Sequence, residues 1–252
     1  MLTEDDKIPF TAHLEELRKR LIRCFIAIGI GFVLSYGFKE RLFHILTEPL
    51  ISAMQSDGKL IFTGLPEAFF TYLKAALFSG IILASPVLLY QFWMFVAPGL
   101  YKTERRMLTP IIIVSTIFFV CGALFGYFIV FPIGFKFFLS FATENIQALP
   151  SMREYLSFAS KLLLAFGLAF ELPIVITFLA KLGIVSVDFL RKNRKYALLL
   201  FFVAAAILTP PDVVSQIMMA FPLMILYELS ILGAIIFGKK KPKEEKVEET
   251  DV

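Results

Sequence analysis

The residues best placed to do chemistry in this sequence are acidic side chains in or beside long apolar runs. Glu171 lies in LAFELPIV and Glu228 in LYELS, whereas Glu16 and Glu104 lie in polar segments that lead into apolar runs. An ionisable group inside a membrane is costly to desolvate and is therefore a candidate for a functional site. These acids predict ion pairing or proton binding.

Signatures of enzymes are missing from the chain. It contains no HExxH, GxSxG, GxGxxG or P-loop sequence, so the common hydrolase and nucleotide-binding motifs are absent. His13 and His44 are the only histidines, which argues against a histidine-based metal site or triad. Cys24 and Cys121 lie in apolar segments without CxxC spacing and read as small apolar side chains. We expect a protein that is not an enzyme and that binds no cofactor or metal.

The elements that position these acids are membrane-spanning helices. Of the 252 residues 58% are hydrophobic and 18% are charged, whereas a soluble domain averages about 25% charged. Charge-free runs cover 27 residues (75–101) and 29 residues (107–135), and about 20 apolar residues span a bilayer. We predict an all-α integral membrane protein of six kinked helices in a bent bundle. The six predicted spans are 21–38, 69–95, 108–131, 158–180, 196–208 and 213–238.

Lysine and arginine counts predict the orientation of these spans. Of the 25 basic residues, 18 lie in the N-terminal segment, the second and fourth connections and the tail. Basic residues are enriched on the cytoplasmic side of a membrane, so both termini are predicted to be cytoplasmic. The net charge of +4 therefore reflects topology, and we expect no nucleic-acid partner.

The remaining segments complete the predicted organisation. Residues 1–20 form a cytoplasmic amphipathic segment, residues 39–68 and 132–157 form apolar external loops that pack as caps, and the charged tail 239–252 is expected to be a disordered cytoplasmic segment. The fifth span is short and ends at a pair of prolines. Kinks are expected where prolines interrupt spans, at Pro86, Pro173 and Pro222.

The N-terminal segment PFTAHLEELRKRLIRC has helical periodicity. In the structural interpretation it is an interfacial helix with an i,i+4 ion pair between Glu16 and Arg20. In the functional interpretation Glu16 faces a binding partner. The predicted apolar face holds Phe10, Leu14, Leu17 and Leu21, and the adjoining polar stripe holds His13, Glu16, Arg20 and Arg23.

The other acids have structural alternatives too. Glu104 could be a solvated loop charge beside Arg105, and Asp212 could be the N-cap of the sixth span. Glu171 could be a buried polar group at the Pro173 kink, and this alternative stays open. For Glu228 the structural interpretation is favoured.

Five motifs point to one family. AHLEELRKRL (12–21), SPVLLYQFWMFVAPGLYKTERR (85–106), YFIVFP (127–132), FGLAFELP (166–173) and LTPPDVVSQ (208–216) occur in this order. Together they closely resemble the TatC family, the core membrane subunit of twin-arginine protein translocases. The resemblance runs from about residue 10 to about residue 238, and one small departure is an additional acid, Glu15, beside Glu16.

The resemblance implies a receptor for twin-arginine signal peptides in a bacterial or archaeal cytoplasmic membrane. The shape that it implies is a curved, cupped bundle and not a pore. Transport of folded cargo would be driven by the proton-motive force with TatA- and TatB-type single-span subunits, and self-association is possible. By matching positions, the implied signal-peptide site comprises Glu16, Glu104 and Phe95, with Arg18 and Arg105 beside the two acids.

The resemblance also implies roles for residues away from that site. The implied intramembrane polar groups are Glu171 and Gln216, to which the apolar run around Glu228 adds a third candidate. The implied turn and kink positions are Pro49, Pro86 and Asp212. The main alternative is a proton-coupled transporter of a small solute that uses Glu171 and Glu228 as ion-binding acids. It is disfavoured because the chain shows no inverted repeat.

Overall fold

The computed structural model describes residues 10–54, 59–96, 108–143, 148–209 and 212–238, and these segments are almost entirely helical. The elements are α1 (Phe10–Tyr36), α2 (Lys39–Ala53), α3 (Glu67–Val96), α4 (Leu108–Phe125), the π-helical segment η4 (Gly126–Val130), α5 (Phe131–Leu139), α6 (Met152–Ala169), α7 (Leu172–Lys181), α8 (Val187–Lys192), α9 (Arg194–Leu208) and α10 (Val213–Phe237).

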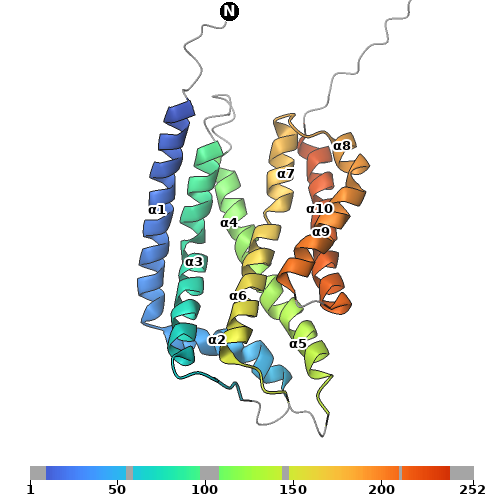
Figure 1. The fold of residues 1–252 in the computed structure, drawn as a ribbon. Coiled ribbons are helices and arrows are strands. Elements are labelled where there is room, and N and C mark those ends of the chain that lie inside the picture. Colours follow the sequence, from blue (N-terminus) through green and yellow to red (C-terminus); the bar gives the residue numbers. More distant parts are fainter. Residues whose placement is uncertain (1–9, 55–58, 97–107, 144–147, 210–211, 239–252) are drawn as a thin grey trace, which may run out of the picture.

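Four helical stretches are long and apolar enough to cross a membrane: α3, α4 to α5, α6 to α7, and α10. α1 and α2 pass the same test only together, as a pair bent by 89°, and Figure 1 shows α1 running the height of the bundle while α2 lies across one end. α9 corresponds to the short fifth predicted span and falls below the length of this test. Its 15 residues extend about 22 Å at about 1.5 Å per residue, less than the ~30 Å hydrocarbon core. We call the end that holds α2 the cap end, and the end where α1 begins the opposite end.

Two helices differ from their predicted bounds. The third span continues past residue 131 through η4 and α5 to Leu139, because Pro132 lies in the first turn of α5, where no backbone N–H is needed. The fourth span is interrupted at Phe170 and Glu171, just before Pro173 in α7. In contrast, α3 continues through Pro86 and α10 continues through Pro222.

Glycines set how closely neighbouring helices approach. A Cβ on Gly31 of α1 would lie 2.5 Å from the Gly80 carbonyl oxygen of α3, and a Cβ on Gly80 would lie 2.6 Å from the Phe32 nitrogen. Gly122 of α4 similarly faces the Phe166 carbonyl of α6. Small residues allow this close contact between apolar helices, where van der Waals packing drives association.

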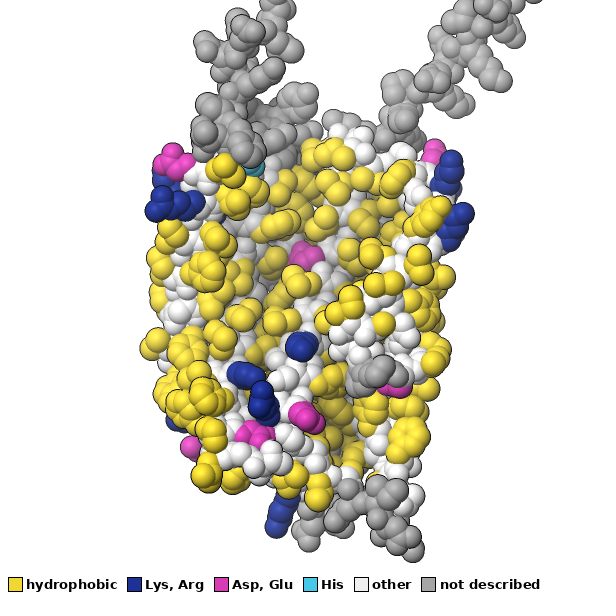
Figure 2. Space-filling model, viewed as in Figure 1, with side chains coloured by type: hydrophobic (Ala, Val, Ile, Leu, Met, Phe, Trp, Pro, Cys, Tyr) yellow, Lys and Arg dark blue, Asp and Glu magenta, His cyan; other side chains and the backbone are white. Residues whose placement is uncertain are grey.

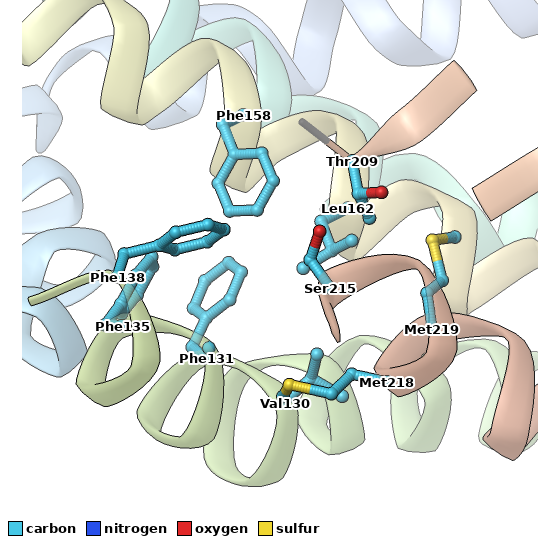
Figure 3. A pocket seen from close by; sticks show the side chains of 11 residues that line it. Val130, Phe131, Phe135, Phe138, Phe158, Leu162, Thr209, Ser215, Met218 and Met219 are labelled. Atoms are coloured by element: carbon cyan, nitrogen blue, oxygen red, sulfur yellow. The ribbon is translucent and has the colours of Figure 1, made fainter. Parts of the chain in front are cut away.

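Aromatic side chains fill the main core between α5, α6 and α10. Phe131 and Phe135 are buried, with ring centroids 5.0 Å apart, and Figure 3 shows them with Phe138 reaching toward Phe158. Thr209 and Ser215 lie on the other side of a small cavity of about 20 Å³. This volume holds a single water at most, so the core is tightly packed here.

At the cap end one carboxylate accepts several hydrogen bonds. Glu67, the first residue of α3, accepts hydrogen bonds from the backbone N–H of Thr63 (2.7 Å) and Gly64 (3.2 Å) and from the Thr63 hydroxyl (3.1 Å). It also accepts bonds from the Ser151 hydroxyl (2.7 Å) and the Arg153 N–H (3.2 Å) at the start of α6. Glu67 therefore fixes the level of α3 relative to α6.

α2 is tied to the bundle through Pro49. Proline has no N–H, so within α2 the carbonyl of Ile45 lacks its usual donor four residues later. The Tyr127 hydroxyl of η4 donates to this carbonyl over 2.6 Å, and Phe43, Leu46 and Leu50 of α2 are buried in the main core. The π-helical segment thus supplies the hydrogen bond that Pro49 removes.

Candidate functional site

Polar and aromatic side chains join α1 to α3 at the opposite end of the bundle. The His13 imidazole stacks on the Phe95 ring, with centroids 4.5 Å apart and planes at 21°. Arg20 donates from Nε to Glu16 Oε1 over 2.9 Å, and its Nη2 also donates to this oxygen. Arg20 Nη1 donates to Gln91 Oε1 of α3 over 3.3 Å. We call these five residues the seam site.

The helical repeat explains how these residues come together. Residues 13, 16 and 20 are spaced by three and four and share one face of α1, as do residues 91 and 95 on α3. The two helices run in opposite directions (Figure 1), and the contact between Gly31 and Gly80 holds them close. The long Arg20 side chain then reaches across to Gln91.

The carboxylate of the seam site is only partly occupied. The Glu16 side chain is 29% exposed and that of Arg20 14% exposed. Both Arg20 bonds go to Glu16 Oε1, and no bond to Oε2 is made within the described residues. Oε2 can therefore accept from a second guanidinium, whose planar fork suits a carboxylate. The stack of His13 on Phe95 offers a flat surface for the apolar stem of such a ligand.

The orientation of α1 differs from that of an ordinary interfacial helix. Leu14, Leu17 and Leu21 are exposed, whereas Glu16 and Arg20 face α3. This arrangement suits a helix whose outer surface meets lipid, because polar groups are then satisfied only within the bundle. The predicted polar stripe is thus the packed face at the level of the seam site, and the predicted apolar face points outward.

Other members of the predicted signal-peptide site lie elsewhere. Arg18 is exposed on α1, away from the seam, and its side chain makes no hydrogen bond or ion pair with the described residues. Glu15 is also on the outer surface, where it pairs with Lys19 over 2.7 Å. Glu104 and Arg105 lie outside the described residues. The structure therefore brings together Glu16 and Phe95 from the predicted set.

Glu171 is buried at the break between α6 and α7. Neither carboxylate oxygen has a hydrogen-bond partner among the described residues. The Ser115 hydroxyl of α4 lies near the carboxyl group. Ser115 Oγ accepts from Trp93 Nε1 over 2.8 Å. Glu171 is therefore a buried carboxyl group at the break before Pro173, and its functional role stays a prediction.

The remaining predicted polar residues have structural partners. Glu228 is exposed and pairs with Arg194 of α9 over 2.7 Å. Asp212 is the N-cap of α10, with its side chain accepting from the Ser215 N–H over 2.7 Å. Gln216 Nε2 donates to the Phe202 carbonyl of α9 over 2.9 Å. The bonds of Glu228 and Gln216 hold the short α9 against α10.

Similarity to known proteins shows the family to which this chain belongs. The sequence profile of the Sec-independent protein translocase protein (TatC) family matches residues 12–222. The chain belongs to the TatC family. The Sec-independent protein translocase protein TatC of Desulforapulum autotrophicum is 65% identical over 254 aligned residues, covering 100% of this chain and 94% of that protein. The TatC protein of Escherichia coli K12 is 40% identical, covering 97% of this chain and 95% of that one.

A solved structure described as the crystal structure of the twin arginine translocase receptor TatC is also similar. It is 42% identical and superposes with a TM-score of 0.81, covering 89% of this chain and 98% of that chain. The predicted all-α fold of six helices in a cupped bundle is confirmed by this match and by the helices above. The protein is a multi-pass membrane protein of a translocase family.

Three features of these sites escaped sequence reasoning. Gln91 stands in the apolar run LLYQFWMF, where a lone amide in a span could have marked a polar partner. Arg20 was assigned only to a surface pair with Glu16. Tyr127 gave no signal in its own segment, because its partner is a carbonyl 82 residues earlier.

Proposed function

We propose that this protein is the receptor and core subunit of a twin-arginine translocase, in which Glu16 binds an arginine of the signal peptide. The observation that supports this assignment is the seam site. There a partly exposed carboxylate leaves one oxygen unbonded within the described residues, beside the aromatic stack of Phe95 and His13. The names of the family and of its relatives point the same way.

In this proposal Glu104 binds the second arginine. It lies eight residues beyond the end of α3 in the sequence, so the connection after α3 can bring it to the side of the seam site where Phe95 lies. Arg105 follows Glu104 directly in the sequence, and Arg18 adds positive charge on the outer surface of α1. Such charges repel stray cations and favour ligands that contact both carboxylates.

The proposed working context follows from the family and from the distribution of charge. Both termini and the seam site face the cytoplasm, and the cap end faces outward, as the excess of basic residues at the seam-site end indicates. TatA- and TatB-type single-span subunits join this chain to form the passage for folded cargo, driven by the proton-motive force. The protein acts by binding and assembly and not as an enzyme.

The alternative of a small-solute transporter has weaker support. It requires Glu171 and Glu228 to bind ions, and Glu228 is exposed and already paired with Arg194. Uptake of a labelled solute into liposomes that contain only this chain would favour the transporter over the receptor.

The test is binding of a signal peptide to the purified full chain. We expect a peptide with two arginines to bind more tightly than its twin-lysine version. Glu16→Ala should weaken twin-arginine binding about tenfold or more, since a hydrogen bond to a charged group contributes about 1.5–3 kcal/mol. Glu15→Ala is the matched control, because Glu15 pairs only with Lys19 on the outer surface. Equal affinities for wild type and Glu16→Ala would refute the proposed role of Glu16.

A further inference from the structure

Basic side chains gather on α3 and α6 near the cap end. Lys74 is the only Lys or Arg of α3, and Arg153 and Lys161 are the only ones of α6. All three are exposed, and Figure 2 shows dark-blue side chains over the lower part of the face that these helices form. We call these three residues the basic patch. It lies far from the seam site.

The register of the two helices places the two lysines at the same depth. Glu67 contacts Ser151 and Arg153, so the first turns of α3 and α6 are level, and both helices rise from the cap end (Figure 1). Lys74 follows Glu67 by seven residues, about 10 Å of helix, and Lys161 follows Arg153 by eight residues, about 12 Å. Because α3 packs against α6, the lysines stand on neighbouring helices at one level.

This level lies just inside the edge of the hydrocarbon core. The spans of α3 and of α6 to α7 each have 30 residues, about 45 Å, against a core of about 30 Å. A centred span therefore extends about 7 Å beyond the core at each end. The backbone of each lysine is then only a few ångströms inside the boundary, from which its flexible stem can carry the ammonium back to the lipid phosphates.

The charges of the patch are not neutralised within the protein. The side chains of Lys74, Arg153 and Lys161 make no hydrogen bond or ion pair with any described residue. The nearby Glu67 carboxylate is filled by backbone and hydroxyl donors, and Glu154 lies at the level of Arg153, below the two lysines. Exposed apolar side chains follow at greater depth, with Leu77 three residues after Lys74 and Leu168 seven residues after Lys161.

We propose that the basic patch binds an anionic phospholipid of the leaflet at the cap end. The lipid phosphate lies between Lys74 and Lys161, Arg153 attracts the outer part of the headgroup, and an acyl chain runs along Leu77 and Leu168. Lipid is favoured over an acidic residue of a partner helix because the lysines lie at the phosphate level of the bilayer and not at its centre. This binding does not depend on the proposed receptor function.

The test is lipid binding to the purified full chain, measured by native mass spectrometry with phosphatidylglycerol and phosphatidylcholine of matched acyl chains. We expect wild type to prefer phosphatidylglycerol, and each lysine near the surface to contribute about fivefold. Lys74→Gln with Lys161→Gln should remove most of this preference, and Lys74→Arg with Lys161→Arg should keep it. The control is Lys59→Gln with Lys136→Gln, which removes two exposed lysines elsewhere near the cap end.

Three results would overturn the proposal: no preference in wild type, a full preference in the Lys74→Gln, Lys161→Gln variant, or an equal loss in the control. A photocrosslinker at position 161 that captures a protein in native membranes, with lipid binding unchanged in the glutamine variant, would assign the patch to a partner helix instead. Fluorescence of Trp93, buried at the other end of α3, reports whether each variant is folded.

Discussion

The bond between Tyr127 and Ile45 gives a quantitative test of how Pro49 is accommodated. Tyr127→Phe removes only the hydroxyl that donates to the Ile45 carbonyl. Pro49 cannot replace this donor. Ile45 and Tyr127 both line an open apolar pocket of about 700 Å³ between α1, α2, α3 and α4. A hydrogen bond between neutral groups contributes about 0.5–1.5 kcal/mol, and we expect Tyr127→Phe to destabilise the protein by this amount.

A double-mutant cycle separates this explanation from a general loss of packing. Pro49→Ala restores an N–H four residues after Ile45, so the carbonyl regains a helical hydrogen bond. In that background Tyr127→Phe should cost less, with a coupling of about 0.5–1.5 kcal/mol.

Unfolding can be followed through Trp93, the only tryptophan of the chain, which is buried and bonded to Ser115. The control is Tyr90→Phe, since Tyr90 is exposed and has no hydrogen bond among the described residues. If Tyr127→Phe costs the same with and without Pro49, the reasoning is wrong.

Three further changes have defined outcomes. In the same unfolding assay Gly31→Ala should be less stable than Gly29→Ala by about 1–3 kcal/mol. A Cβ at position 31 meets Gly80, whereas a Cβ at position 29 meets nothing within 4 Å. Equal stabilities would contradict the close α1–α3 contact. Glu67→Gln should speed proteolysis at the cap end several-fold while Glu154→Gln does not. Glu67 bonds both the Thr63 loop and the start of α6, in addition to the backbone pairing of Ile61 with Pro150 and Met152, whereas the Glu154 side chain bonds no described residue; unchanged cleavage would refute this. Glu171→Gln should support export of a twin-arginine cargo and Glu171→Leu should not, because a polar group is needed at the α6–α7 break; full export with leucine would contradict that need.

The sequence was most informative where composition alone decides the structure. The charge-free run 107–135 could only be a membrane helix, and α4 to α5 covers it. Prolines were harder to interpret. Pro86 and Pro222 are compatible with continuous helices, whereas the fourth span breaks before Pro173. The difference depends on which neighbouring groups satisfy the freed carbonyls, and that is a tertiary property.

The candidate site was predictable only in part for the same reason. The spacing of residues 13, 16 and 20 on one helical face follows from the sequence. The sequence does not show whether this face turns toward the protein or away from it, because an amphipathic helix beside a bilayer can direct its leucines to lipid or to the protein. The contribution of Gln91 depends on the pairing of α1 with α3 across 71 positions of sequence separation.

The bond from Arg20 to Glu16 means that the proposed receptor holds a copy of its ligand's own chemical group. This internal guanidinium is tethered one helical turn away and is therefore present at a very high effective concentration. An incoming arginine must either take the second carboxylate oxygen or displace Arg20, so a stray single cation gains little by entering. Arg20 thus raises the free energy that a ligand must gain in order to bind Glu16. A ligand gains enough only when a second contact adds to the first.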